Sequence, residues 1–445
     1  MLFDNIAAIS TAPMASGVAI IRIRGESPLS IAEKMFLSKT PVRDFEPYKM
    51  YVCTIDGGEV KDFGMCVYFK APRSYTGEDM VEFQCHGGVA ITRAVLSRAL
   101  DLGARLAERG EFTRRAFLNG KMSLSSCEGL VDMIYAQSDA EAKMGFYLYK
   151  EKLFNKIKAV QDDIKYVLAL IDANIDYPEE DLEFADEKKV VDALKKSRAT
   201  LLPLVEGYRD AGKFSHGVKV AICGRPNAGK SSLLNAILRC EKAIVTDIEG
   251  TTRDVVEGSR ELRGVRFDFY DTAGIRESGN VIEKIGIKKS KEIISFADVV
   301  IVLIDGAAGL SDEDKRLLDE TAAKTRLVVV NKGDLISFEP DYAHDLVIST
   351  VTGENLDALE ERLIKITCVD KLNFDGDFLT EKRHYDALNK AIAAIDAALA
   401  AVKKYPLDVV ASDVKDVFVS LGKISGETCD EAVIDEIFSK FCVGK

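Results

Sequence analysis

The sequence is poor in the residues that build metal sites and disulfide frameworks. It has four histidines, and its nine cysteines are scattered without a Cys-x-x-Cys pair. We therefore expect neither a structural zinc site nor a set of disulfides, and a cytoplasmic location fits this cysteine usage.

Long apolar runs and secretion signals are also missing. The apolar run 299–304 is far shorter than the roughly 20 residues that a membrane-spanning helix needs. Asp4, and no basic cluster, precedes the first apolar stretch. We expect no membrane segment and no signal peptide.

The overall composition is that of a globular protein with several domains. The chain has 445 residues, of which 47% are hydrophobic and 30% charged. This length predicts two to four domains, and the composition argues against long disorder or a fibrous repeat. The 60 basic and 72 acidic residues give a net charge of −12, which disfavours indiscriminate binding of nucleic acid.

Four segments with different patterns follow one another along the chain. Residues 1–120 alternate short strands (18–23, 65–69, 80–84) with helices (29–37, 90–102), which predicts a small α/β domain. Residues 121–215 and 371–445 favour long helices, the latter at 387–403, 409–421 and 429–441. We interpret them as one discontinuous helical domain with residues 216–370 inserted as a second α/β domain.

The inserted segment alternates strands with helices. Strands are predicted at 218–223, 266–270, 299–305 and 327–331, and helices at 231–239, 312–323 and 355–366. This alternation predicts a doubly wound, mostly parallel sheet.

A phosphate-binding loop follows the first of these strands. Residues 224–231 (Gly-Arg-Pro-Asn-Ala-Gly-Lys-Ser) match G-x-x-x-x-G-K-[ST] between a strand and a helix. The backbone around Ala228, Gly229 and Ser232 would surround the phosphates at a helix N-terminus. Lys230 would reach the β- and γ-phosphates, and the Ser231 hydroxyl would bind Mg²⁺.

Later motifs in the same order predict a Ras-like G domain that binds GTP. Residues 271–274 (Asp-Thr-Ala-Gly) end a strand, where Asp271 would hold Mg²⁺ through water and the Gly274 amide would contact the γ-phosphate. Residues 331–334 (Asn-Lys-Gly-Asp) end another strand. The Asp334 carboxylate can accept two hydrogen bonds from guanine, and Ser349 would support the base. The predicted guanine contacts are Asn331, Lys332, Asp334 and Ser349.

The residue after the Asp-Thr-Ala-Gly motif is Ile275, where Ras-like enzymes have the glutamine that orients water. Asn227 with the segment 246–254 offers oxygen ligands for a monovalent cation beside the phosphates. Glu283 is a second candidate, which could orient the attacking water, and Arg276 is a rival for charge stabilisation.

Several motifs give the whole chain a resemblance to the tRNA-modification GTPase family MnmE, also called TrmE. They are residues 74–79 (Ser-Tyr-Thr-Gly-Glu-Asp), 86–88 (His-Gly-Gly), 110–121 (Gly-Glu-Phe-Thr-Arg-Arg-Ala-Phe-Leu-Asn-Gly-Lys), 175–181 (Ile-Asp-Tyr-Pro-Glu-Glu-Asp), 250–254 (Gly-Thr-Thr-Arg-Asp) and 441–445 (Phe-Cys-Val-Gly-Lys). The chain departs from the family at 12–17 (Ala-Pro-Met-Ala-Ser-Gly), where a Pro-Pro-Gly-Arg-Gly-Gly-type segment is usual.

The resemblance implies roles for individual residues. It assigns K⁺ to Asn227, Thr246, Ile248 and Thr251, and Mg²⁺ to Ser231 and Thr252. It makes Glu283 the water-orienting residue with Arg276 in support, and Cys442 the candidate reactive thiol. It places a tetrahydrofolate (5-formyl or methylene) at Arg22, Glu82, Lys121 and Lys445.

The resemblance also implies a homodimer that works with an FAD-containing partner, MnmG (GidA), in a heterotetramer or larger complex. Together they modify C5 of the wobble uridine of tRNA. Two alternatives stay open, namely a ribosome-assembly GTPase of the Era or Der type and a nucleotide-controlled switch without chemistry. A basic patch for tRNA is predicted at Arg105, Arg109, Arg114, Arg115 and Lys121.

Overall fold

The computed structural model describes residues 4–176, 187–215, 217–238, 243–244, 258–272, 290–337, 339–368, 379–402 and 404–445. The chain divides into two compact units. One unit comprises Met1–Val131, Leu148–Leu194 and Ala393–Lys445, and the other comprises Asp132–Tyr147 and Lys195–Ile392. None of the described helices is long and apolar enough to cross a membrane. The finer division at residues 120, 215 and 370 stays a prediction.

The N-terminal part of the first unit is built on a seven-stranded sheet with the order β3-β4-β5-β6-β2-β1-β7. The strands are β1 (Ile6–Ile9), β2 (Ser16–Arg24), β3 (Phe36–Leu37), β4 (Met50–Gly57), β5 (Val60–Phe69), β6 (Met80–Gly87) and β7 (Arg105–Leu106). All neighbours pair antiparallel except β1 and β7. The prediction found β2, β5 and β6 and missed the other four strands.

The two faces of this sheet are covered by different helices. Helices α1 (Pro28–Met35) and α2 (Val89–Asp101) enclose the larger core, which contains Ile21 and Ile23 of β2. Helix α3 (Glu111–Leu118) packs Phe112 against β1 on the other side. Because successive strand residues point to opposite faces, Arg22 lies on the side of α3.

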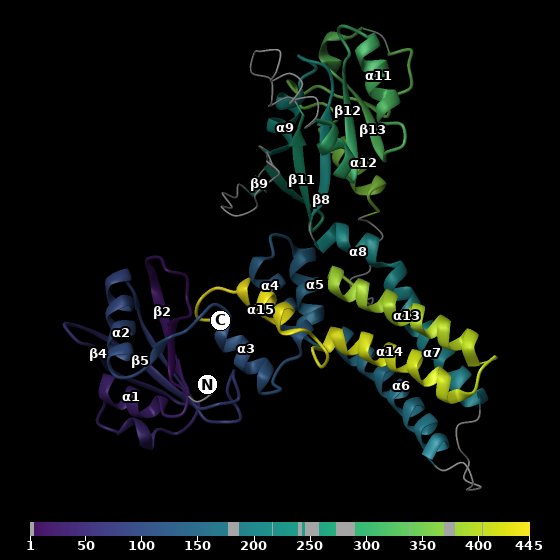
Figure 1. Cartoon of the computed structure of the whole chain (residues 1–445). Coiled ribbons are helices and arrows are strands. Elements are labelled where there is room, and N and C mark those ends of the chain that lie inside the picture. The colour runs from purple at the N-terminus through teal and green to yellow at the C-terminus, as the bar shows by residue number, and fades with distance from the viewer. Residues whose placement is uncertain are drawn as a thin grey trace, which may run out of the picture. The chain divides into compact units, whose positions relative to one another are not determined.

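Helices make up the rest of the first unit, and some of them continue into the second unit or belong to it. They are α4 (Leu124–Tyr135), α5 (Asp139–Tyr149), α6 (Lys152–Asp176), α7 (Glu187–Glu206), α8 (Tyr208–Ser215), α13 (Lys382–Val402), α14 (Leu407–Ser425) and α15 (Glu431–Ser439). Helices α6 and α14 lie side by side (Figure 1). Helix α4 packs against α15 through Leu124, Cys127, Ile437 and Phe438. Segments far apart in the sequence therefore share a core.

The second unit contains a sheet with the order β14-β13-β12-β8-β11-β10-β9. Its strands are β8 (Val218–Cys223), β9 (Ala243–Ile244), β10 (Gly258–Leu262), β11 (Val265–Asp271), β12 (Val299–Asp305), β13 (Arg326–Asn331) and β14 (Leu346–Val347). The five strands from β14 to β11 are parallel, and β10 is antiparallel to both of its neighbours. The predicted doubly wound, mostly parallel sheet is confirmed.

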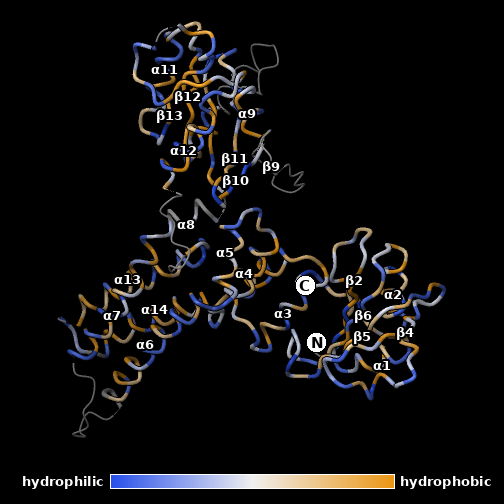
Figure 2. Tube along the Cα trace, turned by 180° about the vertical axis from the view of Figure 1, so that it is seen from behind, coloured by the Kyte–Doolittle hydropathy of each residue, from blue (hydrophilic) through white to orange (hydrophobic). Residues whose placement is uncertain are grey.

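Helices cover both faces of this sheet. Helices α9 (Lys230–Leu238) and α12 (Leu356–Ile366) share one core with Val220 and Ile222 of β8. Helix α11 (Asp312–Glu320) and the helical residues 290–296 pack on the other face. The buried strands β12 and β13 are coloured as hydrophobic in Figure 2. Because β12 and β13 are parallel, their carboxyl ends lie at one edge of the sheet, where the following loops can bind a ligand.

Candidate functional site

The phosphate loop joins β8 to α9, and glycine is required within it. Gly229 has φ +96°, and a Cβ there would overlap Nδ2 of Asn331. Lys230 is buried, and its Nζ donates to the carbonyl oxygens of Gly224 (2.8 Å) and Arg225 (2.9 Å). These carbonyls hold the ammonium at the loop, where phosphate oxygens would replace them.

The predicted guanine-binding residues lie beside this loop. Asn331 is buried, its Nδ2 donates to Ala228 O (2.9 Å), and its Oδ1 accepts from Thr350 N (3.2 Å). The Ser349 hydroxyl donates to Oδ1 of Asp334 (2.6 Å). Asn331 thus joins the phosphate loop to the segment at Ser349, and Ser349 orients the carboxylate of Asp334.

A hydroxyl and a carboxylate meet next to the phosphate loop. Ser231 Oγ donates to Asp271 Oδ2 (3.0 Å) at the end of β11. Hard oxygen ligands of this kind suit Mg²⁺, which usually keeps several waters and binds nucleotide phosphates. The two residues therefore fit the predicted magnesium role.

A cavity of about 990 Å³ is lined by most of the predicted nucleotide residues. Among its lining residues are Asn227, Gly229, Lys230, Ser231, Ser232, Asn331, Lys332 and Asp334. This volume lies at the upper end of the range typical of ligand sites. The predicted residues Thr246, Ile248, Thr251, Thr252, Gly274, Ile275, Arg276 and Glu283 lie outside the described residues.

In the N-terminal sheet, two of the predicted folate residues touch. Arg22 Nε and Glu82 Oε1 are 2.8 Å apart, and Glu82 is buried. The Arg22 guanidinium lies over the rings of Tyr75 (5.2 Å) and Phe112 (5.5 Å). Burial raises the pKa of Tyr75 to about 12, although Thr113 shares a hydrogen bond with its hydroxyl. The aromatic platform is a feature that the sequence analysis missed.

The other two predicted folate residues make different contacts. Lys121 Nζ donates to Pro72 O (3.1 Å). The C-terminal tail pairs Val443 with Arg109, and Ser10 Oγ, just after β1, donates to Gly444 O (3.1 Å). Lys445 is therefore held near the strand that neighbours β2. Cys442 is exposed.

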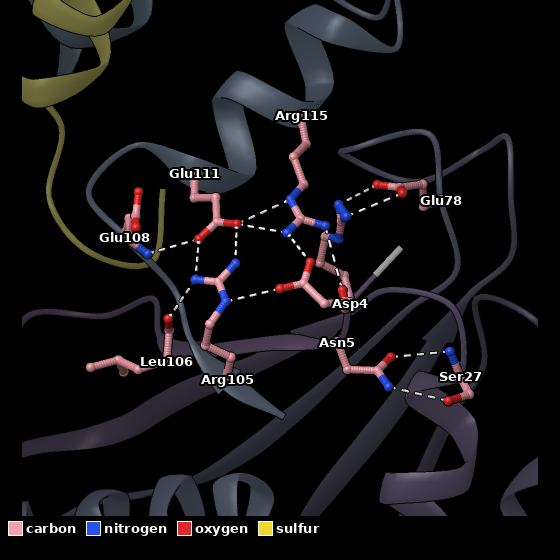
Figure 3. A network of polar contacts seen from close by, with 10 residues as sticks. Asp4, Asn5, Ser27, Glu78, Arg105, Leu106, Glu108, Glu111 and Arg115 are labelled. Carbon is pink, nitrogen blue, oxygen red and sulfur yellow. Dashed lines mark hydrogen bonds and ion pairs between the residues drawn. The ribbon is translucent and has the colours of Figure 1, made fainter. Parts of the chain in front are cut away.

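Three arginines of the predicted basic patch form ion pairs with acidic side chains. Figure 3 shows Arg105 and Arg115 sharing Glu111 and Asp4. Nearby, Arg24 of β2 forms an ion pair with Glu78. Burial alone would raise the pKa of Asp4, but hydrogen bonds from Arg115 and Arg105 outweigh it and lower the value to about 2.

Arg114 also has acidic partners, since it lies 3.0 Å from Asp435. Glu111 and Arg115 thus join α3 to Arg105 and Asp4, whereas Arg114 joins it to α15. Arg105, Arg114 and Arg115 are paired with acidic side chains, and the basic patch for tRNA that they would form with Arg109 and Lys121 stays a prediction.

Comparisons with known proteins agree over nearly the whole chain. Residues 5–121 match the family described as "GTP-binding protein TrmE N-terminus", and residues 124–442 match "MnmE helical domain". The tRNA modification GTPase MnmE of Clostridioides difficile strain 630 is 39% identical over 99% of both chains. The protein of that name from Geobacter sulfurreducens is 37% identical, again over 99% of both chains. This chain belongs to the MnmE family of tRNA modification GTPases.

Proposed function

We propose that this protein hydrolyses GTP to modify C5 of the wobble uridine of tRNA, in the cytoplasm, together with an FAD-containing MnmG partner. A tetrahydrofolate (5-formyl or methylene) would supply the one-carbon unit. The observation that carries the proposal is the presence, in one chain, of a guanine-nucleotide site and the Arg22–Glu82 pair over aromatic rings. Family membership over the full length supports it.

Residues of the phosphate loop and of the segments that follow β11 and β13 would bind the nucleotide and Mg²⁺. Lys230 would bind the β- and γ-phosphates, and Ser231 with Asp271 and Thr252 would hold Mg²⁺. The bound metal would supply positive charge to the phosphoryl oxygens. Asn331 positions the phosphate loop through Ala228 O, and the Asp334 carboxylate would select guanine.

A potassium ion would do the work of an arginine finger by placing positive charge beside the phosphates. Asn227 has φ +67° and lines the nucleotide cavity, so its amide oxygen is available from a loop position beside the phosphates. With Thr246, Ile248 and Thr251 it would form an oxygen cage that fits K⁺ better than the smaller Na⁺.

Hydrolysis should therefore be faster in KCl than in NaCl at matched ionic strength, and Asn227→Ala should abolish the difference. Glu283→Ala should keep GTP binding while slowing hydrolysis, since that residue would orient water and Arg276 would only assist. Equal rates in the two salts would contradict the potassium site.

The N-terminal sheet would bind the folate. A pterin presents amide-like edges that a carboxylate such as Glu82 can bind, and its glutamyl tail needs cations such as Lys121 and Lys445. The Arg22–Glu82 pair is already satisfied internally, so a ligand would have to share or exchange these contacts. Calorimetry with a reduced folate should show binding that Glu82→Gln weakens. Cys442 is the proposed thiol for the one-carbon chemistry.

An exposed apolar strip supports the proposed homodimer. Met50, Val52 and Phe63 of β4 and β5 are 52%, 59% and 65% exposed and share one face of the sheet. Contiguous exposed apolar side chains often mark a protein interface. Phe63→Asp should lower the mass measured by light scattering, whereas the same change at Tyr166 of α6, which is 64% exposed, should leave it unaltered.

Reconstitution distinguishes this function from the alternatives. Purified protein, an MnmG partner, unmodified tRNA, GTP, Mg²⁺, KCl, a reduced folate and either glycine or ammonium as the nitrogen donor should together yield an aminomethyl-type wobble uridine detectable by mass spectrometry. Omission of GTP or of folate should prevent the product. A ribosome-assembly GTPase of the Era or Der type, or a switch without chemistry, would yield none under any condition.

A further inference from the structure

A buried carboxylate at the end of β12 contacts residues that line the nucleotide cavity. Asp305 is the last residue of this strand, which lies between β8 and β13, the strands leading to the phosphate loop and to the Asn-Lys-Gly-Asp motif. Its Oδ2 is 2.7 Å from Lys332 Nζ, and its Oδ1 accepts from the backbone amides of Ala307 and Ala308. Lys332 lines the cavity.

The same carboxylate faces a cation of the phosphate loop. Arg225 Nη2 is 3.9 Å from Asp305 Oδ2, and Arg225 Nε is 3.7 Å from Asp314 Oδ2. Both arginine nitrogens are buried and, within the described part of the chain, have no hydrogen-bond partner. The guanidinium is therefore held by charge, between two buried carboxylates, rather than by fixed hydrogen bonds.

Each carboxylate is itself fixed. Asp314 belongs to the capping box of α11, where its Oδ2 accepts from the Ser311 amide (3.0 Å). Burial alone would raise the pKa of Asp305, but the hydrogen bond and charge of Lys332 outweigh it, and the pKa lies below its usual value. Asp305 consequently stays ionised in the folded protein.

We propose that Asp305 is a positioning residue of the GTPase site, which couples guanine recognition to phosphate binding. One carboxylate holds Lys332 of the base-binding motif and Arg225 of the phosphate loop, both of which line the cavity. Asp305 is not among the described cavity-lining residues and acts through these two cations. Arg225 and Lys332 would shift together when its charge is removed.

The variant Asp305→Asn tests this role. It keeps the size of the side chain but removes the charge between the two cations. We expect GTP and GDP to bind about tenfold to a hundredfold more weakly, as for loss of a buried hydrogen bond to a charged group. The kcat at saturating GTP should change little, because the loss affects ground state and transition state alike.

Two comparisons separate positioning from general damage to the fold. Asp312→Asn removes an exposed carboxylate paired with Lys315 at 3.0 Å in the same domain, and it should leave nucleotide affinity unchanged. In a double-mutant cycle, Lys332→Met should cost much less in Asp305→Asn than in the wild type.

The fraction of protein that binds fluorescent GDP at saturation must stay that of the wild type, and Asp305→Glu should recover part of the affinity. Additive losses in the cycle, or wild-type affinity in Asp305→Asn, would overturn the proposal.

Discussion

Replacing Gly229 with alanine should destabilise the domain and weaken nucleotide binding, through two effects that can be measured separately. The residue has φ +96°, a conformation that costs an L-residue about 1–2 kcal/mol. The new Cβ would also displace Asn331 and break its hydrogen bond to Ala228 O, which leaves a buried carbonyl unsatisfied at a further cost of about 1–3 kcal/mol. The first cost falls on the stability of the domain, and the second acts on the binding site, so GTP affinity should fall about 5-fold to 150-fold.

The release rate of fluorescently labelled GDP, measured by stopped flow, would show the loss of nucleotide affinity. Gly309→Ala is the matched control, since Gly309 has φ +70° but open space around its Cβ position. It should lower the stability of the domain without a comparable loss of affinity. Asn331→Ala deletes the same hydrogen bond, so adding it to Gly229→Ala should weaken binding little further. An affinity of Gly229→Ala within twofold of the control would refute this reasoning.

Three further predictions concern charge. Asp334→Asn replaces an acceptor with a donor facing the guanine amine, so GTP affinity should fall about tenfold to a hundredfold and xanthosine nucleotides should bind better, as competition assays would show. The pKa of Asp4 is lowered from 3.8 to about 2, so its contribution to stability is present above pH 4 and is lost as the pH falls towards 2. The free energy of unfolding of Asp4→Asn, measured in urea at several pH values, should lack this part of the pH dependence. The same change with pH in Asp4→Asn and in the wild type would contradict this. Glu141→Gln removes one of the two carboxylates that lie 3.1 Å from Arg266, the other being Asp268. Urea unfolding should show a loss of about 1–3 kcal/mol in the free energy of unfolding, and an unchanged value would contradict this.

The nucleotide site could be predicted from the sequence because its motifs are local. Residues 224–231 and 331–334 each follow a buried strand, and parallel strands bring their carboxyl ends to one edge. Asp305 also follows this pattern, since it is an acidic residue at the end of the apolar strand β12. Its proposed role could not be predicted, because it depends on contacts with Arg225 and Lys332, which lie far away in the sequence.

The N-terminal sheet was harder to predict. The prediction missed β4, in which residues 50–53 are all apolar although only Tyr51 and Cys53 of these face the core. The apolar–polar alternation that marks a half-buried strand is therefore absent. A charge count suggested that Arg105 and Arg115 form a basic surface, because sequence does not show that Asp4 and Glu111 neutralise them. Tertiary ion pairs of this kind become visible only in the folded chain.

The most direct test of the account is the wobble-uridine content of tRNA in a strain that lacks this protein. Mass spectrometry of tRNA nucleosides would compare rescue by the wild type, by Lys230→Ala and by Glu82→Gln, with GTPase activity measured on each purified protein. The account predicts full modification with the wild type and none with Lys230→Ala, which should not hydrolyse GTP. It predicts a strong loss with Glu82→Gln, which should still hydrolyse GTP. Full modification with Lys230→Ala, or in the strain without the protein, would contradict the central claim that this GTPase modifies tRNA.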